Sequence, residues 1–171
     1  MAGGFFSHQT LTLTRPTRQL SPEDAAYLGG LIDGEGTISL TRRHARERRQ
    51  LVVSISSTES CILDWVLATV GAGKITRKRV VSSRHAPGLT CSISNRQGLS
   101  VLAQVAPYLR SYKRRRAQLV LERYLILTPR NGKYSDTASR ARVAFERDFL
   151  QINARQHPAH APTLVSRSRR S

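Results

Sequence analysis

The chain has 171 residues, of which 28 are Lys or Arg and 11 are Asp or Glu, so its formal net charge is +17. This length suits one domain with a sizeable core, and no apolar run approaches the length that a membrane span needs. The basic surplus indicates a polyanionic partner, because each neutralised phosphate releases a counterion. On charge alone, a ribosomal or nonspecific RNA-binding protein is as good an interpretation as any other.

The two cysteines predict neither a disulfide framework nor a zinc site. Cys61 lies in a helical apolar pattern and Cys91 in a strand pattern, so both are expected to be small core residues. This usage fits a reducing compartment. We expect an intracellular protein, from a bacterial or archaeal cytoplasm or from an organelle.

Both ends of the chain differ in composition from the middle. Residues 1–20 are rich in Thr and Arg and lack acids, which is faintly similar to an organellar transit peptide. A flexible basic extension is the interpretation that we favour. Residues 154–171 are polar, basic and contain Pro, which predicts a disordered tail. The domain is therefore expected to span 21–153.

A helix is predicted to begin at Ser21, with Pro22 in its first turn and two acids behind it, to run through Ile32 and to stop near 34–36. Alternating apolar residues predict strands at about 37–41, 50–57, 74–81 and 89–94. Helical spacing predicts helices at about 59–70, 96–106, 113–127 and 136–153. The last helix carries its apolar stripe on Ala141, Phe145, Phe149 and Ile152. This order predicts an α+β fold, with an antiparallel sheet covered by helices on one face.

The uncovered face of the predicted sheet carries mostly hydroxyl, amide and basic side chains. Such groups hydrogen-bond to base edges and hold phosphates. A solvated face is the ordinary alternative for an antiparallel sheet, but the basic excess around it favours contact with nucleic acid. The predicted contacts are Ser39, Thr41, Arg43, Arg46, Arg48, Gln50, Val52, Ser54, Ser56, Lys74, Thr76, Lys78, Thr90 and Ser92.

The segment 28–36 reads LGGLIDGEG and places two adjacent glycines inside a predicted helix. Each glycine costs the helix about 1 kcal/mol relative to Ala, and close approach of another backbone would offset that cost. We therefore predict that this helix packs against its twin in a second copy, through Leu28, Gly29, Gly30, Ile32 and Asp33.

The same helix is predicted to end in two carboxylates, Asp33 and Glu35. A twofold axis at this place would bring the acids of both copies together. Hard divalent cations such as Mg²⁺ prefer such oxygen ligands. Two ions about 4 Å apart stabilise the attacking and leaving oxygens in phosphodiester cleavage.

These nine residues resemble the motif of the LAGLIDADG homing endonucleases. Three further segments, TISL, ISSTESCILDWVLATVGAGKI and PYLRSYKRRRAQLVLE, resemble family segments in the expected order, so the resemblance covers roughly 21–127. It implies an αββαββα core whose four-stranded, saddle-shaped antiparallel sheet lies in the major groove of double-stranded DNA. A single motif is similar to members that act as homodimers. The implied activity is that of an intron-encoded endonuclease that binds a long, nearly palindromic target and hydrolyses one phosphodiester bond in each strand.

The resemblance also implies roles for single residues. Glu35 and the carbonyl group of Gly34 would hold the metal, Mg²⁺, for which Mn²⁺ or Ca²⁺ would substitute in binding. Asp33 falls on an acid that is mainly structural, in keeping with the preference of short acids for helix ends. Ser57 falls where many members have a Gln that helps to order the active-site water, although a Ser here also suits a helix cap. Lys113 falls on the basic residue that stabilises the scissile phosphate; the alternative is a phosphate clamp, and which member of 113–116 enters the site stays open.

Three alternative functions remain at this point. The first is an RNA-binding maturase for the host intron, with intron RNA as a possible partner. The second is a family-derived regulator that binds DNA without cutting it; Glu35 argues against this, since such a protein has no chemical need for the acid. The third is a ribosomal-type RNA binder, which leaves the glycine-rich helix ending in acids unexplained. No membrane partner is expected.

Overall fold

The structure is a computed structural model that describes residues 17–42, 44–45, 47–77, 88–129 and 134–154. Its first half contains α1 (Pro22–Glu35), β1 (Gly36–Thr41), β2 (Gln50–Ser57), α2 (Ser60–Val70), β3 (Lys74–Arg77) and β4 (Leu89–Ser94). Its second half contains α3 (Asn95–Val105), the short 3₁₀ helix η1 (Ala106–Tyr108), α4 (Lys113–Arg123) and α5 (Asp136–Gln151).

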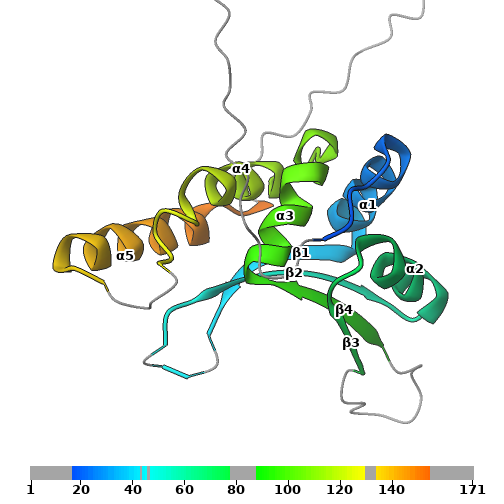
Figure 1. The fold of residues 1–171 in the computed structure, drawn as a ribbon, viewed down its shortest axis with the longest axis horizontal. Helices are drawn as coiled ribbons and strands as arrows, with labels where there is room; N and C mark the ends of the chain where they lie inside the picture. The colour runs from blue at the N-terminus through cyan, green and yellow to red at the C-terminus, as the bar shows by residue number, and fades with distance from the viewer. Residues whose placement is uncertain (1–16, 43, 46, 78–87, 130–133, 155–171) are drawn as a thin grey trace, which may run out of the picture.

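The four strands form one antiparallel sheet in the order β1-β2-β4-β3. The helices lie on one face of this sheet, with α1 and α2 toward one end, α4 and α5 toward the other, and α3 between them (Figure 1). The opposite face, which we call the open face, carries none of the helices that the described residues form. The predicted α+β architecture is therefore confirmed.

The core lies between the sheet and the helices. In β2, Leu51, Val53 and Ile55 are buried while the residues between them are not. Because successive strand side chains point to opposite faces, this alternation assigns the intervening residues to the open face. Leu28 and Ile32 of α1 are fully buried over the same layer. The helix side of the sheet is thus the apolar one, as predicted.

The buried stripe of α5 differs from the prediction. Phe145 and Phe149 are buried as expected, but Arg142 joins them, and Ala141 is only half-buried. The Arg142 guanidinium donates to Thr128 Oγ1 at 2.8 Å and to Glu146 Oε1 at 3.1 Å. Its remaining polar contact is with the Arg49 carbonyl oxygen. These partners explain how a charged group enters the core.

Other boundaries also shift. The expected core position of Cys61 is wrong, because α2 turns this residue outward; Cys91 is buried as predicted. α4 ends at Arg123 rather than 127, and the part of the third predicted strand beyond Arg77 lies outside the described residues. No helix in the described part of the chain is long and apolar enough to cross a membrane.

The folded body begins earlier than residue 21. Arg18 donates its backbone N–H to the Val70 carbonyl at 2.9 Å, and its side chain donates to the Ala68 carbonyl at 2.8 Å. Leu20 is buried, and its N–H donates to Gln104 Oε1. The last four residues of the expected N-terminal extension therefore belong to the domain, because their backbone is hydrogen-bonded to it. The rest of both expected extensions, 1–16 and 155–171, lies outside the described residues.

Candidate active site and nucleic-acid interface

Glu35 lies at the junction between α1 and β1. Ser21 caps the helix, its hydroxyl accepting the Asp24 N–H at 3.1 Å, and the helix ends at Glu35, within the predicted range of 34–36. Gly36 makes the turn into β1: a Cβ there would lie 2.6 Å from Ile32 Cα, so any other residue would displace the backbone. The Glu35 side chain is consequently exposed where the strand begins.

Asp33 has a structural role, as its position at the helix end predicts. One carboxylate oxygen accepts the backbone N–H of Arg110 at 2.6 Å, and the other accepts the Ser111 hydroxyl at 2.6 Å. The Ser111 N–H adds longer contacts to both oxygens. Asp33 therefore fixes the segment before α4 to the end of α1.

Lys113 lies beneath the same helix end. Its side chain is buried, and its amino group donates to the carbonyl oxygens of Ile32 and Asp33, at 2.8 Å each. Burial lowers the pKa of Lys113, the carboxylates of Asp33 and Glu35 oppose that lowering, and Arg116 adds to it. The amino group thus neutralises the negative end of the α1 dipole directly behind Glu35.

The remaining members of the basic run point elsewhere. Arg116 donates to the carbonyl oxygens of Ile152 and Ile38, at 2.8 and 2.9 Å, and so connects α5 to β1. Arg114 and Arg115 are exposed on α4. Of the four candidates in 113–116, Lys113 is the one whose amino group reaches the end of α1.

Ser57 lies at the same end of the sheet as Glu35, since Ile55 pairs with Gly36 and Ser57 is two residues further along β2. Its hydroxyl accepts the Glu59 N–H at 3.0 Å. This contact satisfies a backbone donor at the start of α2, where Glu59 contributes no side-chain cap. The observed contact of Ser57 is therefore a local turn contact just before α2, and not a side-chain cap of that helix.

A divalent cation fits this place only as part of a shared site. Within the described ranges, no three His, Cys, Asp or Glu side chains gather into a group that would hold a metal. Both Asp33 oxygens are engaged, so one chain offers the exposed Glu35 carboxylate and the adjacent Gly34 carbonyl. Mg²⁺ takes six oxygen ligands. The others would have to come from water, phosphate groups or a second copy.

The predicted contact surface of α1 needs correction. Leu28, Gly29 and Ile32 are buried within the single chain, so they belong to its own core. A Cβ on Gly29 would lie 2.9 Å from Tyr108 Cβ, which shows that this glycine makes room for η1 and not for a second copy. Gly30 and Gly34 are exposed, and a Cβ on either would meet nothing within 4 Å.

Most of the predicted nucleic-acid contacts lie together on the open face. The strand register aligns them in rows across the sheet. One row consists of Thr37, Ser54, Ser92 and Lys74; a second consists of Ser56, Thr90 and Thr76; a third consists of Ser39, Val52 and Ser94; and Thr41 pairs with Gln50. Hydroxyl groups connect strands within this surface, as between Ser56 and Thr90 at 2.9 Å.

Four basic residues of the prediction do not join these rows. Arg43, Arg46 and Lys78 lie outside the described residues. Arg48 turns toward the helix layer, where it donates to Ser139 Oγ and lies 5.0 Å from the centre of the Tyr134 ring. Thr37 and Ser94 were missed, although the two-residue alternation that selected Ser39 and Ser92 also reaches them.

Comparison with known proteins finds no matching family model and no matching curated protein. Solved structures do match. The homing endonuclease I-CvuI in complex with its target has a TM-score of 0.63 and 18% identity, over 77% of this chain and 83% of that chain. An archaeal intron-encoded homing endonuclease, I-Vdi141I, complexed with DNA, has a TM-score of 0.53 and 14% identity, over 80% of this chain and 88% of that one. The LAGLIDADG meganuclease I-AabMI bound to uncleaved DNA has a TM-score of 0.54 and 19% identity, over 71% of this chain and 43% of that one. These likenesses establish that the chain has the fold of the LAGLIDADG homing endonucleases.

Proposed function

We propose that this protein is a site-specific double-strand DNA endonuclease that acts as a homodimer with a divalent metal ion. The observation that carries the proposal is the placement of Glu35, an exposed carboxylate fixed at the end of the strands whose open face presents rows of hydroxyl, amide and basic groups. Such a face can read base edges and hold phosphates. The Glu35 carboxylate lies where the phosphodiester backbone of a DNA duplex would cross the end of the sheet. The structural neighbours named above are complexes with DNA.

The residues at the end of α1 divide the work between ligation and positioning. Glu35 and the Gly34 carbonyl would hold the cation, Mg²⁺, for which Mn²⁺ or Ca²⁺ would substitute in binding. Such an ion lowers the pKa of a bound water and stabilises charge on a phosphate. Lys113 keeps the helix end in place through two carbonyl contacts. Ser57 stands beside this end and orders the turn into α2.

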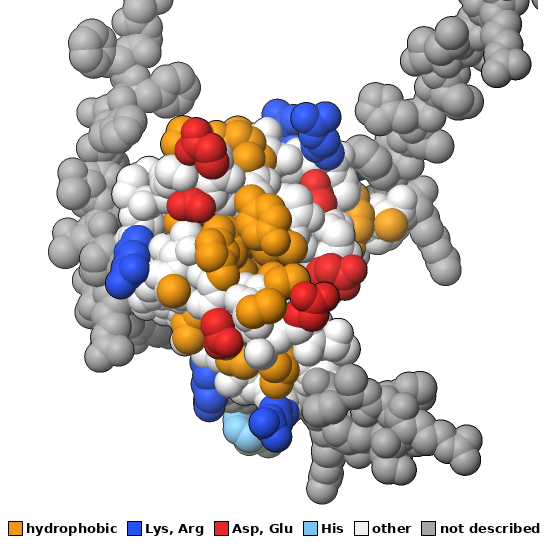
Figure 2. All heavy atoms as spheres, turned by 90° about the vertical axis from the view of Figure 1, so that its right-hand side faces the viewer, with side chains coloured by type: hydrophobic (Ala, Val, Ile, Leu, Met, Phe, Trp, Pro, Cys, Tyr) orange, Lys and Arg blue, Asp and Glu red, His pale blue; other side chains and the backbone are white. Residues whose placement is uncertain are grey.

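The surface that we propose for the second copy is the exposed stripe of α1, which consists of Tyr27, Gly30, Leu31 and Gly34. These residues recur at helical spacing, Tyr27 is 53% exposed, and its ring packs edge-on against Trp65 with the ring centres 4.9 Å apart. Hydrophobic side chains gather on the face formed by α1 and α2, with acidic side chains around them (Figure 2). A twofold axis that passes beside the exposed Gly30 and Gly34 would bring the Glu35 side chains of the two copies together. One target half-site would then face each sheet, which requires a nearly palindromic sequence.

The test begins with a library of random duplexes, from which bound sequences are recovered in Ca²⁺. The recovered duplexes are then incubated with Mg²⁺, and both strands are examined for cleavage. We expect one staggered double-strand break at a nearly palindromic site. Glu35→Gln should keep the binding and lose the cleavage, whereas Glu122→Gln, which changes an exposed carboxylate on α4, should keep both.

Two results would contradict the proposal. The first is a wild-type protein that cuts no recovered duplex, and the second is a Glu35→Gln protein that cuts at the wild-type rate. Recovery of structured intron RNA in place of duplex DNA would support the maturase alternative. Specific duplex binding without cleavage would support the regulator.

A further inference from the structure

A basic cavity of about 930 Å³ opens at the end of the sheet opposite Glu35. It lies between the start of β2, the start of α3, the end of α4 and the helix α5. Its lining contains Arg48, Arg49, Arg96 and Arg142 against one acid, Glu47. Neither the motif nor the proposed cleavage chemistry uses this cavity, so its charge calls for a separate explanation.

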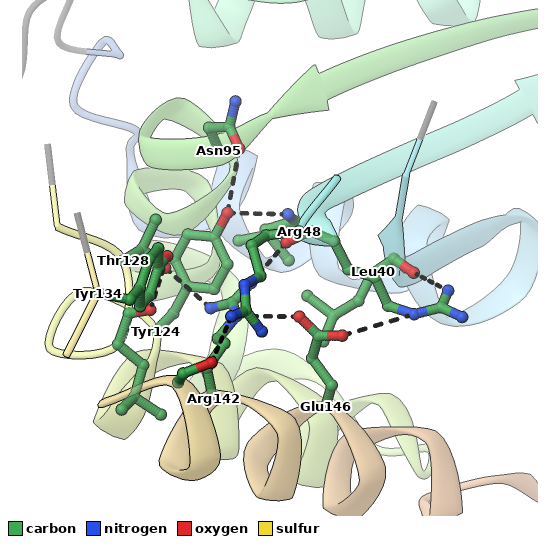
Figure 3. Close-up of polar contacts among 12 residues, drawn as sticks. Leu40, Arg48, Asn95, Tyr124, Thr128, Tyr134, Arg142 and Glu146 are labelled. Carbon is green, nitrogen blue, oxygen red and sulfur yellow. Dashed lines mark hydrogen bonds and ion pairs between the residues drawn. The ribbon is translucent and has the colours of Figure 1, made fainter. Parts of the chain in front are cut away.

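Two of these arginines are structural. Arg142 is buried and holds the end of α4, the start of β2 and Glu146 together (Figure 3). Arg49 donates to the Leu40 carbonyl at 3.1 Å and lies 3.7 Å from Glu146. Glu146 thus partly balances the charge of Arg49 and Arg142, and the N–H groups of both guanidinium groups donate to oxygen atoms of the protein.

The other two arginines have donors to offer. A guanidinium carries five N–H groups. Within the described part of the chain, Arg96 makes one long contact of 3.5 Å, to the Thr128 carbonyl. Arg48 is exposed; it donates to Ser139 Oγ and lies against the Tyr134 ring, which supports its stem. Arg48 and Arg96 therefore both line this cavity and both have N–H groups left to donate to a ligand.

The floor of the cavity is continuous with the open face. Gln50 belongs to that face, and its Oε1 accepts the Asn95 amide at 3.3 Å. Asn95 Oδ1 accepts the Tyr124 hydroxyl at 3.0 Å, and that hydroxyl accepts the Leu51 N–H at 3.0 Å (Figure 3). Asn95 takes a positive φ of 54°, a conformation that Asn tolerates better than most residues. The chain of hydrogen bonds holds the rim of the cavity rigidly beside the first residue of β2.

The position of the cavity identifies its ligand. β1 has six residues from Gly36 to Thr41, and Arg48 precedes Gln50, the partner of Thr41, so Arg48 lies about 20 Å or more from Glu35 along the strands. Arg96 lies closer to Glu35, because it follows Ser94, which shares a row with Ser39. A duplex that follows the open face would pass this rim about six base pairs from the point of cleavage. A guanidinium group matches phosphate oxygens in geometry as well as charge. We infer that Arg48 and Arg96 clamp the phosphodiester backbone of the DNA that flanks each half-site, outside the bases that the strands read.

This inference rests on the proposed binding of duplex DNA, and its test measures binding without cleavage. Two duplexes share one recovered target; one ends at the target, and the other is longer by a helical turn of about 10 base pairs at each end. Affinities are measured in Ca²⁺ at several salt concentrations. The variant is Arg48→Gln/Arg96→Gln. The matched control is Arg140→Gln/Arg147→Gln, which removes the same charge from exposed positions of α5 outside the cavity.

We expect the clamp variant to lose affinity for the long duplex by about tenfold or more and to lower the slope of log K against log salt by about 1 for each phosphate contact removed. The short duplex and the control variant should show a much smaller change. Equal losses on both duplexes, or no loss on either, would overturn the inference. Unchanged duplex binding with a selective loss of single-stranded RNA would overturn it in favour of an RNA site.

The two proposals fail separately. A protein that prefers the long duplex through Arg48 and Arg96 but never cuts leaves the clamp standing and removes the endonuclease. A protein whose cleavage depends on Glu35 but whose affinity does not depend on the flanking DNA supports the endonuclease and removes the clamp. If no specific target is recovered, random duplexes of the two lengths serve for the same comparison.

Discussion

The amino group of Lys113 and the carbonyl oxygen of Asp33 lie 2.8 Å apart, while the Asp33 carboxylate accepts the N–H groups of Arg110 and Ser111. The end of α1 is thus joined to the start of α4 by two sets of hydrogen bonds, and α1 is the acceptor in both: its carbonyl oxygens accept from Lys113, and the Asp33 carboxylate accepts from the segment before Lys113. Glu35, two residues after Asp33, inherits its position from this junction.

Removing the lysine tests the junction. Lys113→Met leaves the Ile32 and Asp33 carbonyls without their charged donor, so the free energy of unfolding should fall by about 1–3 kcal/mol. Cleavage should fall more than DNA binding, because Glu35 loses its fixed position. Denaturant unfolding and single-turnover cleavage are the measurements. Lys74→Met, on an exposed strand position, is the control and should keep the stability of the wild type.

The pKa of the same lysine predicts a dependence of stability on pH. Burial lowers the pKa of Lys113 from its ordinary 10.5, so just below that pH the unfolded chain binds more protons at this residue than the folded one. Stability contributed by Lys113 therefore rises with pH toward 10.5 and is lost as pH falls through the lowered folded pKa. The measurement is the difference in unfolding free energy between the wild type and Lys113→Met, in which other titrations cancel. A difference that stays level or shrinks with rising pH would contradict this account.

The neighbouring glycines of α1 make a matched pair. Gly30→Leu adds a helix-favouring side chain in open space, so the monomer should gain about 0.5–1 kcal/mol while self-association and cleavage are lost. Gly29→Leu should instead destabilise the fold, because its Cβ would lie 2.9 Å from Tyr108 Cβ. Sedimentation and thermal unfolding separate the two effects. A Gly30→Leu protein that still forms dimers would place the second copy on another surface.

Ser57 gives a smaller effect. Loss of its hydroxyl in Ser57→Ala removes the acceptor for the Glu59 N–H and should lower the unfolding free energy by about 1 kcal/mol. If this turn contact is its whole role, cleavage at saturating Mg²⁺ stays near the wild-type rate. Ser57→Asp, which keeps an acceptor at a helix start, should restore stability. A large loss of cleavage in a stable Ser57→Ala protein would instead assign Ser57 to the ordering of water.

Arg142 should be among the most sensitive positions of α5. Arg142→Met removes hydrogen bonds to Thr128 and Glu146 and the contacts of the guanidinium with the Tyr124 and Phe145 rings, at 5.0 and 5.1 Å. We expect the unfolding free energy to fall by about 2–4 kcal/mol. Arg147→Met, on the exposed side of the same helix, should change it little. Equal stability of the two variants in denaturant would show that Arg142 is dispensable.

Local patterning predicted the sheet and the placement of Glu35 well, because both depend on short-range periodicity. The two-residue alternation of β2 selected its buried side, and the glycine-bounded acids marked the end of α1. The features that local patterning did not predict, the role of Gly29 and the burial of Arg142, depend on residues that are distant in the sequence. Gly29 makes room for η1, some 80 residues away in the chain, and no pattern within α1 distinguishes it from Gly30. Arg142 is buried because Thr128 and Glu146 accept hydrogen bonds from its guanidinium group, and the apolar stripe of a helix does not reveal such partners.

The register of the open face has a consequence for altering its recognition of DNA. Alternate residues along a strand are about 6.6 Å apart, close to two base-pair steps of a duplex. Thr37, Ser54, Ser92 and Lys74 come from four different strands yet lie in one row, and the row of Ser56, Thr90 and Thr76 is joined by a hydroxyl contact. Residues that share a row compete for the same volume and the same hydrogen bonds. Substitutions that change specificity should therefore act non-additively within a row and nearly independently between rows, so that the row, and not the strand, is the unit in which this surface evolves.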